Sequence, residues 1–338
     1  MRCLIVRFSS LGDIILTTPV VESLAEAGAE VHFAVAARYA ELLAYFPRPM
    51  TGHAFSGRTQ GDLANYAAGF ADRRFDLVLD LHANWRSRML VRRLDAHHVL
   101  TYPGDFFRRW SMVYLKRGFI RARHVVERYL ETIRETQIPV VTSVPRLVIP
   151  AQEKAPAKRS LTQLGWSPDR STIGIGWGAR WPTKKVPVKL WGELAARLKT
   201  TPAAYLIFAA AQDQTEVAEF VERSGRENVF PVIGKPLPDV LGAISFCHVF
   251  VSSDSGLMHA AAALGVPTLG IFGPTHPALG FAPRGPGSHA IHSGIFCSPC
   301  SRHGRAPCYR RHRHCFERIN VESLAELVRE HLRGSIGR

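Results

Sequence analysis

The stretch HVFVSSDSGLMHAAAALGVPTLGIFGPTHP, residues 248–277, alternates apolar runs with one helical segment. Strand-like apolar runs occur at 248–251 and 268–272, and the pattern between them predicts a helix at 256–264. Runs that are apolar throughout are typical of parallel strands that helices cover on both faces. The stretch therefore predicts a strand–helix–strand unit of an α/β sheet.

The same alternation extends over most of the chain in two blocks. Because 338 residues exceed the size at which one core keeps growing, we expect two α/β domains. Residues 145–169 contain four prolines and little periodicity, which predicts a linker. Further strands are expected at 3–8, 31–36, 75–81, 98–102, 172–177, 204–210 and 228–233. Further helices are expected at 19–27, 38–45, 188–198, 214–224, 238–246 and, after the capping residue Asn320, at 321–332.

The charge balance predicts a polyanionic partner. Lys and Arg number 43 against 28 Asp and Glu, a formal net charge of +15, and the segment 85–128 has eleven basic residues against three acidic ones. Such a charge suits nucleic acid, an anionic membrane surface or a phosphorylated substrate. The start of the chain lacks the pattern of a secretion signal, and Gly265 and Pro267 interrupt the most apolar stretch, 259–273. We therefore expect a cytoplasmic protein without a transmembrane helix.

Four of the six cysteines fall in one short segment, residues 297–315, here called the cysteine segment. Cys297 and Cys300 form a C-x2-C pair, and Cys308 and Cys315 follow. This spacing is compatible with a structural zinc site, although the longer gaps differ from those of standard zinc ribbons. Reduced cysteines packed without a metal are the alternative.

Asp13 lies at the first strand–helix junction, in the loop SSLGD at 9–13. A carboxylate there either caps the helix or acts as a base facing a ligand site. The loop lacks the G-x-G-x-x-G pattern of dinucleotide-binding sites.

Two loops of the second half have the composition of an anion site. Thr183 and Lys184, in GWGARWPTKK at 176–185, offer a hydroxyl and an ammonium to a phosphate, without matching the Walker pattern. A helix beginning at Ser255 or Gly256 would present free N–H groups at the carboxyl edge of the sheet. Asp254 would accept from a ribose or cap this helix.

In the same helix, His259 would lie near the opening turn or be an ordinary buried residue.

Five stretches together resemble the family 9 glycosyltransferases, the heptosyltransferases of bacterial lipopolysaccharide core assembly. They are SSLGDIILTTPVVESL at 9–24, DLHANWRSR at 80–88, GARWPTKKVP at 178–187, DSGLMHAAAALGVPTLGIFGPTHP at 254–277 and CSPC at 297–300. The resemblance implies an α/β GT-B fold, in which two Rossmann-like domains face each other across a cleft. Residues 1–160 would bind the acceptor and residues 161–338 the nucleotide sugar.

The resemblance also implies an activity. The enzyme would transfer heptose, with inversion, from ADP-L-glycero-D-manno-heptose to the Kdo or heptose of an anionic lipid A core acceptor, at the cytoplasmic face of the inner membrane. It implies no cofactor and no metal. Another nucleotide sugar or surface-glycan acceptor is the alternative. By this resemblance, Asp13 is the catalytic base; Thr183, Lys184, Asp254, Ser255, Gly256 and His259 bind the donor; and Arg7, Arg86 and Arg88 bind the acceptor.

This chain departs from the common family pattern at two positions. Val186 precedes Pro187 where members commonly have Trp, and His82 stands where many have Gln.

Two other classes of function are disfavoured. A nucleotide-dependent oxidoreductase would need G-x-G-x-x-G followed by an acidic residue about 20 positions later, and neither half has this combination. The isoelectric point near 10.0 and the cysteine segment suggest a nucleic-acid-binding protein. The basic residues are not interleaved with a base-stacking surface, so we expect no nucleic acid partner.

Overall fold

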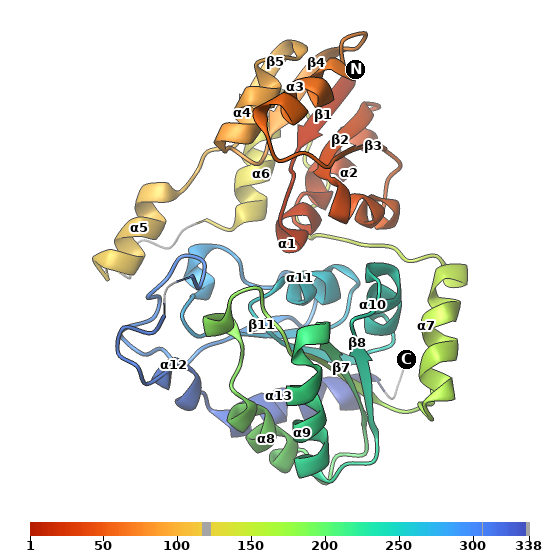
Figure 1. Ribbon diagram of the computed structural model, residues 1–338, viewed down its shortest axis with the longest axis vertical. Coiled ribbons are helices and arrows are strands. Elements are labelled where there is room, and N and C mark those ends of the chain that lie inside the picture. Colours follow the sequence, from red (N-terminus) through yellow and green to blue (C-terminus); the bar gives the residue numbers. More distant parts are fainter. Residues whose placement is uncertain (117–122, 306, 336–338) are drawn as a thin grey trace. The chain divides into compact units, whose positions relative to one another are not determined.

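The computed structural model describes residues 1–116, 123–305 and 307–335, and it divides into two compact units (Figure 1). Unit 1 comprises Met1–Asp105 and Arg123–Val148, and unit 2 comprises Phe106–Ala122 and Ile149–Arg338. A short segment from the first half of the sequence thus belongs to the second unit.

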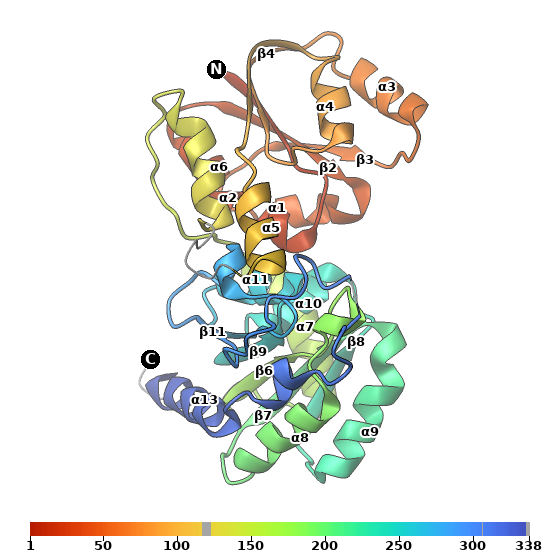
Figure 2. The same cartoon turned by 90° about the vertical axis from the view of Figure 1, so that its left-hand side faces the viewer.

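Unit 1 is a five-stranded parallel sheet in the order β3-β2-β1-β4-β5. Helices α3 and α4 pack on one face through an aromatic-rich core, and Figure 2 shows α2 and α6 on the other face. The strands are β1 Arg2–Val6, β2 Glu30–Ala36, β3 Thr51–Phe55, β4 Arg74–Asp80 and β5 Asp95–Thr101. The helices are α1 Leu11–Ile15, α2 Thr18–Glu26, the 3-10 helix η1 Ala37–Tyr45, α3 Gln60–Ala68, α4 Trp85–Val91 and α6 Val125–Arg134.

Unit 2 is a six-stranded parallel sheet in the order β11-β10-β9-β6-β7-β8. Its strands are β6 Thr172–Gly176, β7 Ala204–Ala209, β8 Val229–Ile233, β9 Val249–Ser253, β10 Thr268–Ile271 and β11 His289–Ile291. Its α-helices are α5 Phe106–Tyr114, α7 Ala151–Gln163, α8 Val188–Arg197, α9 Gln214–Ser224, α10 Leu237–Ile244, α11 Gly256–Ala263, α12 His314–Glu317 and α13 Val321–Ser335. The 3-10 turns are η2 Pro182–Lys184, η3 Ala211–Asp213 and η4 Pro277–Leu279.

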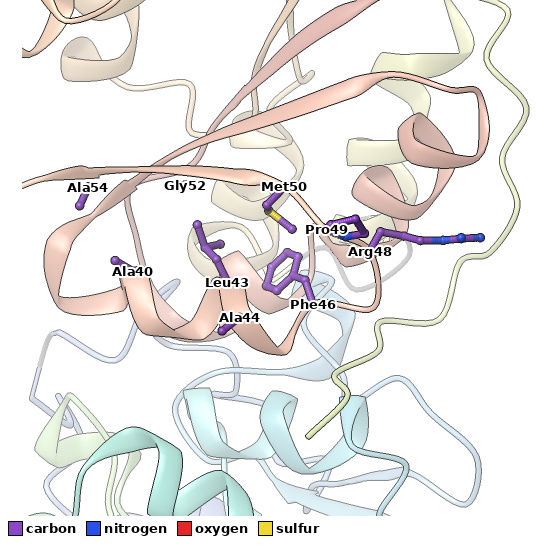
Figure 3. Close-up of a pocket in the computed structure, with 9 residues that line it drawn as sticks. All are labelled: Ala40, Leu43, Ala44, Phe46, Arg48, Pro49, Met50, Gly52 and Ala54. Carbon is purple, nitrogen blue, oxygen red and sulfur yellow. The ribbon is translucent and has the colours of Figure 1, made fainter. Parts of the chain in front are cut away.

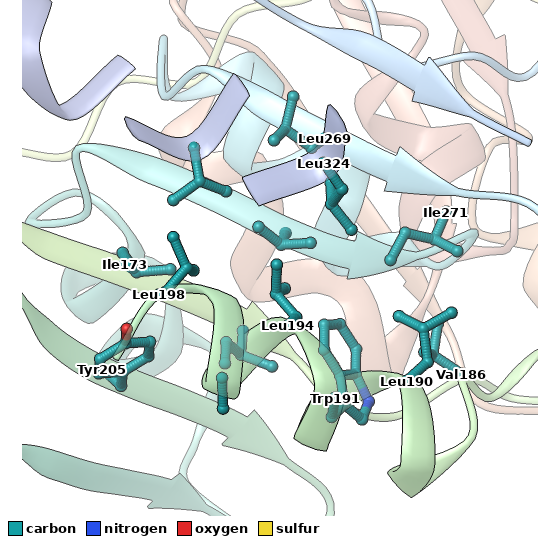
Figure 4. Close-up of a cluster of buried hydrophobic side chains, with 14 of the residues drawn as sticks. Ile173, Val186, Leu190, Trp191, Leu194, Leu198, Tyr205, Leu269, Ile271 and Leu324 are labelled. Carbon is teal, nitrogen blue, oxygen red and sulfur yellow. The ribbon is translucent and has the colours of Figure 1, made fainter. Parts of the chain in front are cut away.

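Alternate residues of the central strand β9 face the two cores of unit 2. Val249 and Val251 pack with α8, α9 and α13, whereas Phe250 packs with α7, α10 and α11. Figure 4 shows Trp191 of α8 and Leu324 of α13 among the side chains of the first core. Because each fully buried aliphatic side chain contributes ~1.5–3 kcal/mol, continuous apolar strands are strongly favoured between two helix layers. The expectation of an α/β fold with two parallel, Rossmann-like sheets is confirmed.

The expected linker at 145–169 was wrong in part, because α7 occupies Ala151–Gln163 despite Pro156 in its interior. Ala157 and Leu161, one turn apart, are buried in the second core of unit 2. Gly242 of α10 permits this packing, since a Cβ there would lie 3.0 Å from the Cβ of Ala157. Tertiary burial therefore outweighs the helix-breaking tendency of the proline.

Within the described ranges, no helix has the length and apolar character that a membrane span requires.

Candidate functional site

The strand order reverses once in each sheet, and both points carry candidate site residues. In unit 1 the reversal lies between β1 and β4, and in unit 2 it lies between β9 and β6. Ligands of open α/β sheets bind beyond the carboxyl ends of strands at such points, where the two loops diverge. Asp13 follows β1 and His82 follows β4, while Lys184 follows β6 and Asp254 follows β9.

Asp13 is held at both carboxylate oxygens. Its Oδ1 lies 2.6 Å from Nη2 of Arg7, and its Oδ2 accepts from the Ser10 hydroxyl at 2.6 Å and from the Ser10 N–H at 3.1 Å. Arg7 Nη1 also donates to the Leu81 carbonyl at 2.6 Å, which ties the loop after β1 to the end of β4. With 19% of its side chain exposed, Asp13 both supports the start of α1 and remains accessible to a ligand.

Arg7 is a permanent buried cation. Its side chain is 9% exposed, and its guanidinium lies 5.7 Å from the ring centroid of Tyr129. Burial would lower the pKa of Arg7, but the charge of Asp13, with Tyr129 and Tyr102, raises that pKa above its ordinary value. Arg7 therefore orients Asp13 and compensates its charge. Because Nη1 and Nη2 of its guanidinium are already engaged by Leu81 and Asp13, Arg7 is not fully available to bind an acceptor.

His82 lies beside this ion pair as a neutral imidazole. Burial and the charges of Arg7 and Arg86 lower the pKa of His82 to about 3, against the opposing effect of Asp13. The ring packs 5.8 Å from the ring of Phe8, and its buried Nδ1 has no hydrogen-bond partner within the described chain. The site therefore has a neutral nitrogen next to a charged pair at physiological pH.

The buried Asp80, at the end of β4, shapes the loop that carries His82. Its Oδ1 accepts from the N–H groups of His82 at 3.1 Å and Ala83 at 2.8 Å, and its Oδ2 accepts from the Ser87 hydroxyl at 2.9 Å. This role was missed at the level of sequence, although an Asp at a strand end followed by a turn is a signal for such a bond.

Arg86 and Arg88, the two arginines expected to bind the acceptor, both lie on α4, and Arg86 is the one that lowers the pKa of His82. The Arg86 guanidinium lies 5.3 Å from the ring centroid of Trp85. Arg88 is exposed on the same helix.

In unit 2, Lys184 and Asp254 form a nearly buried ion pair, with Nζ 2.7 Å from Oδ2. The same carboxylate oxygen accepts from the Thr275 hydroxyl at 2.7 Å. Asp254 is therefore committed to a side-chain network and positions the ammonium, rather than capping the helix that follows. The pairing of Lys184 with Asp254 and the part played by Thr275 had no signal in the sequence, because the partners lie 70 and 21 positions apart.

The cysteine segment supports the loop that contains Thr183. The Thr183 hydroxyl donates to the Gly304 carbonyl, and Arg313 Nη2 donates to the carbonyls of Thr183 and Lys185. Gly304 has φ +80°, and a Cβ there would lie 2.5 Å from Cγ of Lys184. A glycine is therefore needed both for the backbone conformation and for the position of the Lys184 stem.

Helix α11 begins where it was expected, with Ser255 as its N-cap residue and Gly256 as its first residue. The Ser255 hydroxyl lies 3.2 Å from that of Ser252, at the end of β9. His259 is buried on this helix with 6% of its surface exposed. The structure thus brings Thr183 and Lys184 together with Asp254, which follows β9. His259 is a buried residue of α11, the helix that begins just after Asp254.

The cysteines form no disulfide among themselves. Cys300, Cys308 and Cys315 line a cavity of about 230 Å³ that also borders Thr183 and Arg313. Within residues 1–116, 123–305 and 307–335, no three His, Cys, Asp or Glu side chains converge as a metal site would require. Burial, with the neighbouring thiols, raises the pKa of Cys315 to about 12.

A second cavity, of about 340 Å³, lies between η1 and the start of β3 in unit 1 (Figure 3). Leu43, Phe46 and Met50 line it, and it includes none of the expected site residues.

A family model describes residues 67–308 of this chain as glycosyltransferase family 9 (heptosyltransferase), which is well over half of its length. The chain belongs to glycosyltransferase family 9. It is 27% identical to lipopolysaccharide heptosyltransferase 1 of Pseudomonas aeruginosa over 319 residues, covering 89% of this chain and 86% of the relative.

Solved structures of the family share the fold. The glycosyl transferase family 9 structure from Veillonella parvula gives a TM-score of 0.79 at 20% identity, covering 98% of this chain and 97% of the other. E. coli ADP-heptose LPS heptosyltransferase II gives a TM-score of 0.75 at 21% identity, covering 99% of each chain. These likenesses show that this family 9 member has the same fold as those two proteins.

Proposed function

We propose that the protein is an inverting heptosyltransferase that transfers heptose from ADP-L-glycero-D-manno-heptose to the Kdo or heptose of the lipopolysaccharide inner core. The observation that carries the proposal is the Arg7–Asp13–Ser10 arrangement at the β1–β4 reversal. A relative that matches most of the chain is named a lipopolysaccharide heptosyltransferase.

The proposed reaction uses Asp13 as the base. An acceptor hydroxyl within hydrogen-bond reach of the carboxylate gives its proton to Asp13, and its oxygen attacks the anomeric carbon of the donor heptose. The new C–O bond forms as the bond to the ADP phosphate oxygen breaks, which inverts the anomeric configuration. Arg7 orients Asp13 throughout, and the pair is fixed before the substrate arrives.

Negative charge develops on the departing ADP, and unit 2 supplies groups that stabilise it. Lys184 provides an ammonium that Asp254 orients, and Thr183, whose hydroxyl donates to the Gly304 carbonyl, holds the loop that carries Lys184. The first N–H groups of α11, from Gly256 onwards, add the positive end of a helix dipole. We propose that the donor pyrophosphate and ribose are held by Thr183, Lys184, Asp254, Ser255 and Gly256. His259, in the first turns of α11, would complete this donor site.

The proposal assigns the acceptor to residues 1–160 and the donor to residues 161–338. Arg86 and Arg88 would meet the phosphates and carboxylates of the lipid A core, and Arg7 would contribute through Asp13. Two features favour a site of action at the cytoplasmic face of the inner membrane: the lipid-linked acceptor and the net charge of +15.

The proposal includes independence from metal ions, since Lys184 and the α11 dipole supply the positive charge that the leaving group needs. Turnover should be unchanged in EDTA. A loss in EDTA that Mg²⁺ restores would contradict this part of the proposal.

The test is mass spectrometry of a Kdo-bearing lipid A acceptor after incubation with the protein and ADP-heptose. A gain of one heptose, with release of ADP, is expected, and the Asp13→Asn variant should show neither at the wild-type rate. ADP release without transfer would contradict the acceptor assignment. Absence of both would contradict the donor and favour another nucleotide sugar.

A further inference from the structure

Helix α5 is attached to unit 2 along one face only. Met112 and Val113 are buried against Leu279, and the Arg109 guanidinium lies 4.7 Å from the ring centroid of Phe281. The turn after the helix is anchored as well, because Lys116 Nζ donates to the carbonyls of Cys297, at 2.9 Å, and Pro299. Positions 109, 112 and 113 follow helical spacing, so they form a single anchoring face of α5, and Lys116 adds a contact just beyond the helix.

Much of the remaining surface of α5 is apolar and exposed. Phe107 is 81% exposed and Tyr114 is 62% exposed, and Trp110 lies between them at helical spacing. Phe106 and Leu115 flank this stripe. Of thirteen large hydrophobic side chains exposed in the described chain, these five occur within ten consecutive residues. Single exposed apolar residues need no explanation, but a contiguous group of this kind marks a docking surface.

The aromatic side chains of this stripe associate with each other and not with the unit 2 core. The rings of Trp110 and Tyr114 lie 5.5 Å apart, and those of Phe106 and Phe107 lie 5.8 Å apart. The aromatic stripe is therefore a preformed surface on a helix whose opposite face is anchored.

The charges around the stripe are positive. Arg108 is exposed on the helix, and the Arg302 guanidinium lies 4.6 Å from the ring centroid of Phe106. Residues 106–116 contain no acidic residue, although Asp105 directly precedes them, and Arg108 is the basic residue among them that takes no part in the anchoring contacts given above. Aromatic residues beside arginine, on a short helix without acidic residues, have the chemistry of helices that lie in the interface of an anionic bilayer.

We propose that the aromatic stripe of α5, formed by Phe106, Phe107, Trp110, Tyr114 and Leu115, docks on an anionic lipid bilayer. The rings would enter the headgroup region while Arg108 and Arg302 meet lipid phosphates. The inference rests on the proposed function for its purpose, since docking there delivers the enzyme to a lipid-anchored acceptor. Vesicle binding needs neither donor nor acceptor, so the two proposals fail separately.

The first experiment is flotation of the full chain with phosphatidylethanolamine–phosphatidylglycerol vesicles and, in parallel, with phosphatidylcholine vesicles. The wild type should float with the anionic vesicles, less so as salt screens the arginines. A Phe107→Ser/Tyr114→Ser variant should bind at least about tenfold more weakly, because two exposed rings no longer enter the interface. The matched control is Leu164→Ser, which changes an exposed apolar residue at the end of α7.

The second experiment separates docking from catalysis. On a water-soluble, Kdo-terminated acceptor the Phe107→Ser/Tyr114→Ser variant should keep wild-type turnover. On a lipid-anchored acceptor with the same Kdo terminus, embedded in anionic vesicles, its rate should fall by the factor lost in binding, while Leu164→Ser should match the wild type. Circular dichroism melting checks that both variants are folded.

The proposal is overturned if the wild type does not float with anionic vesicles or if the double variant floats equally well. It is also overturned if the wild type self-associates in sedimentation through this face and ignores vesicles, which would assign the stripe to a second copy of the chain.

Discussion

Replacing Asp13 by Asn tests whether the carboxylate is a base or only a structural cap. The amide keeps the size of the side chain and one oxygen for Arg7, but it removes the charge that compensates a guanidinium only 9% exposed. It also places an N–H₂ group where Ser10 now donates twice. Removing one partner of a buried pair costs about 3–5 kcal/mol, and because one hydrogen bond survives we expect the lower end, about 3 kcal/mol.

The kinetic effect of Asp13→Asn should exceed what the loss of stability explains. Loss of a general base lowers turnover by a factor on the order of 10² to 10⁴, while the KM for the nucleotide sugar should change by less than about threefold. Urea unfolding followed by circular dichroism gives the folded fraction, and coupled detection of ADP release gives the rate of that fraction.

Ser10→Ala is the matched control, because it removes a hydroxyl that bonds to Asp13 but leaves the carboxylate. It should cost about 1 kcal/mol and less than about tenfold in turnover. If Asp13→Asn, corrected for folded fraction, turns over as fast as Ser10→Ala, then Asp13 is a cap and not the base.

Three further perturbations test other parts of the structure. Lys184→Ala should raise the KM for the nucleotide sugar by about 10- to 100-fold, which corresponds to the loss of one hydrogen bond to a charged group. Lys189→Ala, which changes an exposed lysine, should leave this KM unchanged. Equal KM values for the two variants would show that the phosphate does not bind at Lys184. Gly242→Val should lower the free energy of unfolding by about 1–3 kcal/mol, because its side chain overpacks the contact between α7 and α10. Gly192→Ala, at a position with open space around it, should raise the free energy of unfolding by about 0.5–1 kcal/mol. Unchanged melting temperatures of both variants in calorimetry would contradict these expectations. Burial, with neighbouring charges, lowers the pKa of His53 to about 4, so between about pH 6.5 and 4 the unfolded chain binds more protons than the folded protein. The free energy of unfolding should therefore fall as the pH is lowered through that window. The urea midpoint of His53→Gln should fall less steeply with pH than that of the wild type, and equal slopes for the two proteins would refute the assignment.

The elements with the clearest signal in the sequence are those whose burial is complete, although the mostly exposed β5 was also expected, at 98–102. Strands β1, β9 and β10 are buried along nearly their whole length, and each has a continuous apolar run. The edge strand β3, Thr51–Phe55, is mostly exposed and has no such run, so it was not predicted. The same holds for α7, whose helical pattern is obscured by prolines and whose stability comes from packing on α10.

The candidate site shows the same division. Asp13, Lys184 and Ser255 could be placed from sequence because carboxyl ends of parallel strands are where ligand groups collect. The pairings that orient them could not be predicted. Asp254 reaches Lys184 and Arg313 reaches Thr183 only through tertiary contacts, and no local spacing encodes such pairs.

The dependence of the Thr183–Lys185 loop on the cysteine segment separates two tasks in the chain. The sheet determines where the proposed donor loop leaves β6, but backbone and side chains more than one hundred positions later, at Gly304 and Arg313, determine its course. We therefore expect substitutions in residues 297–315 to change how this loop presents Lys184, without altering either strand end.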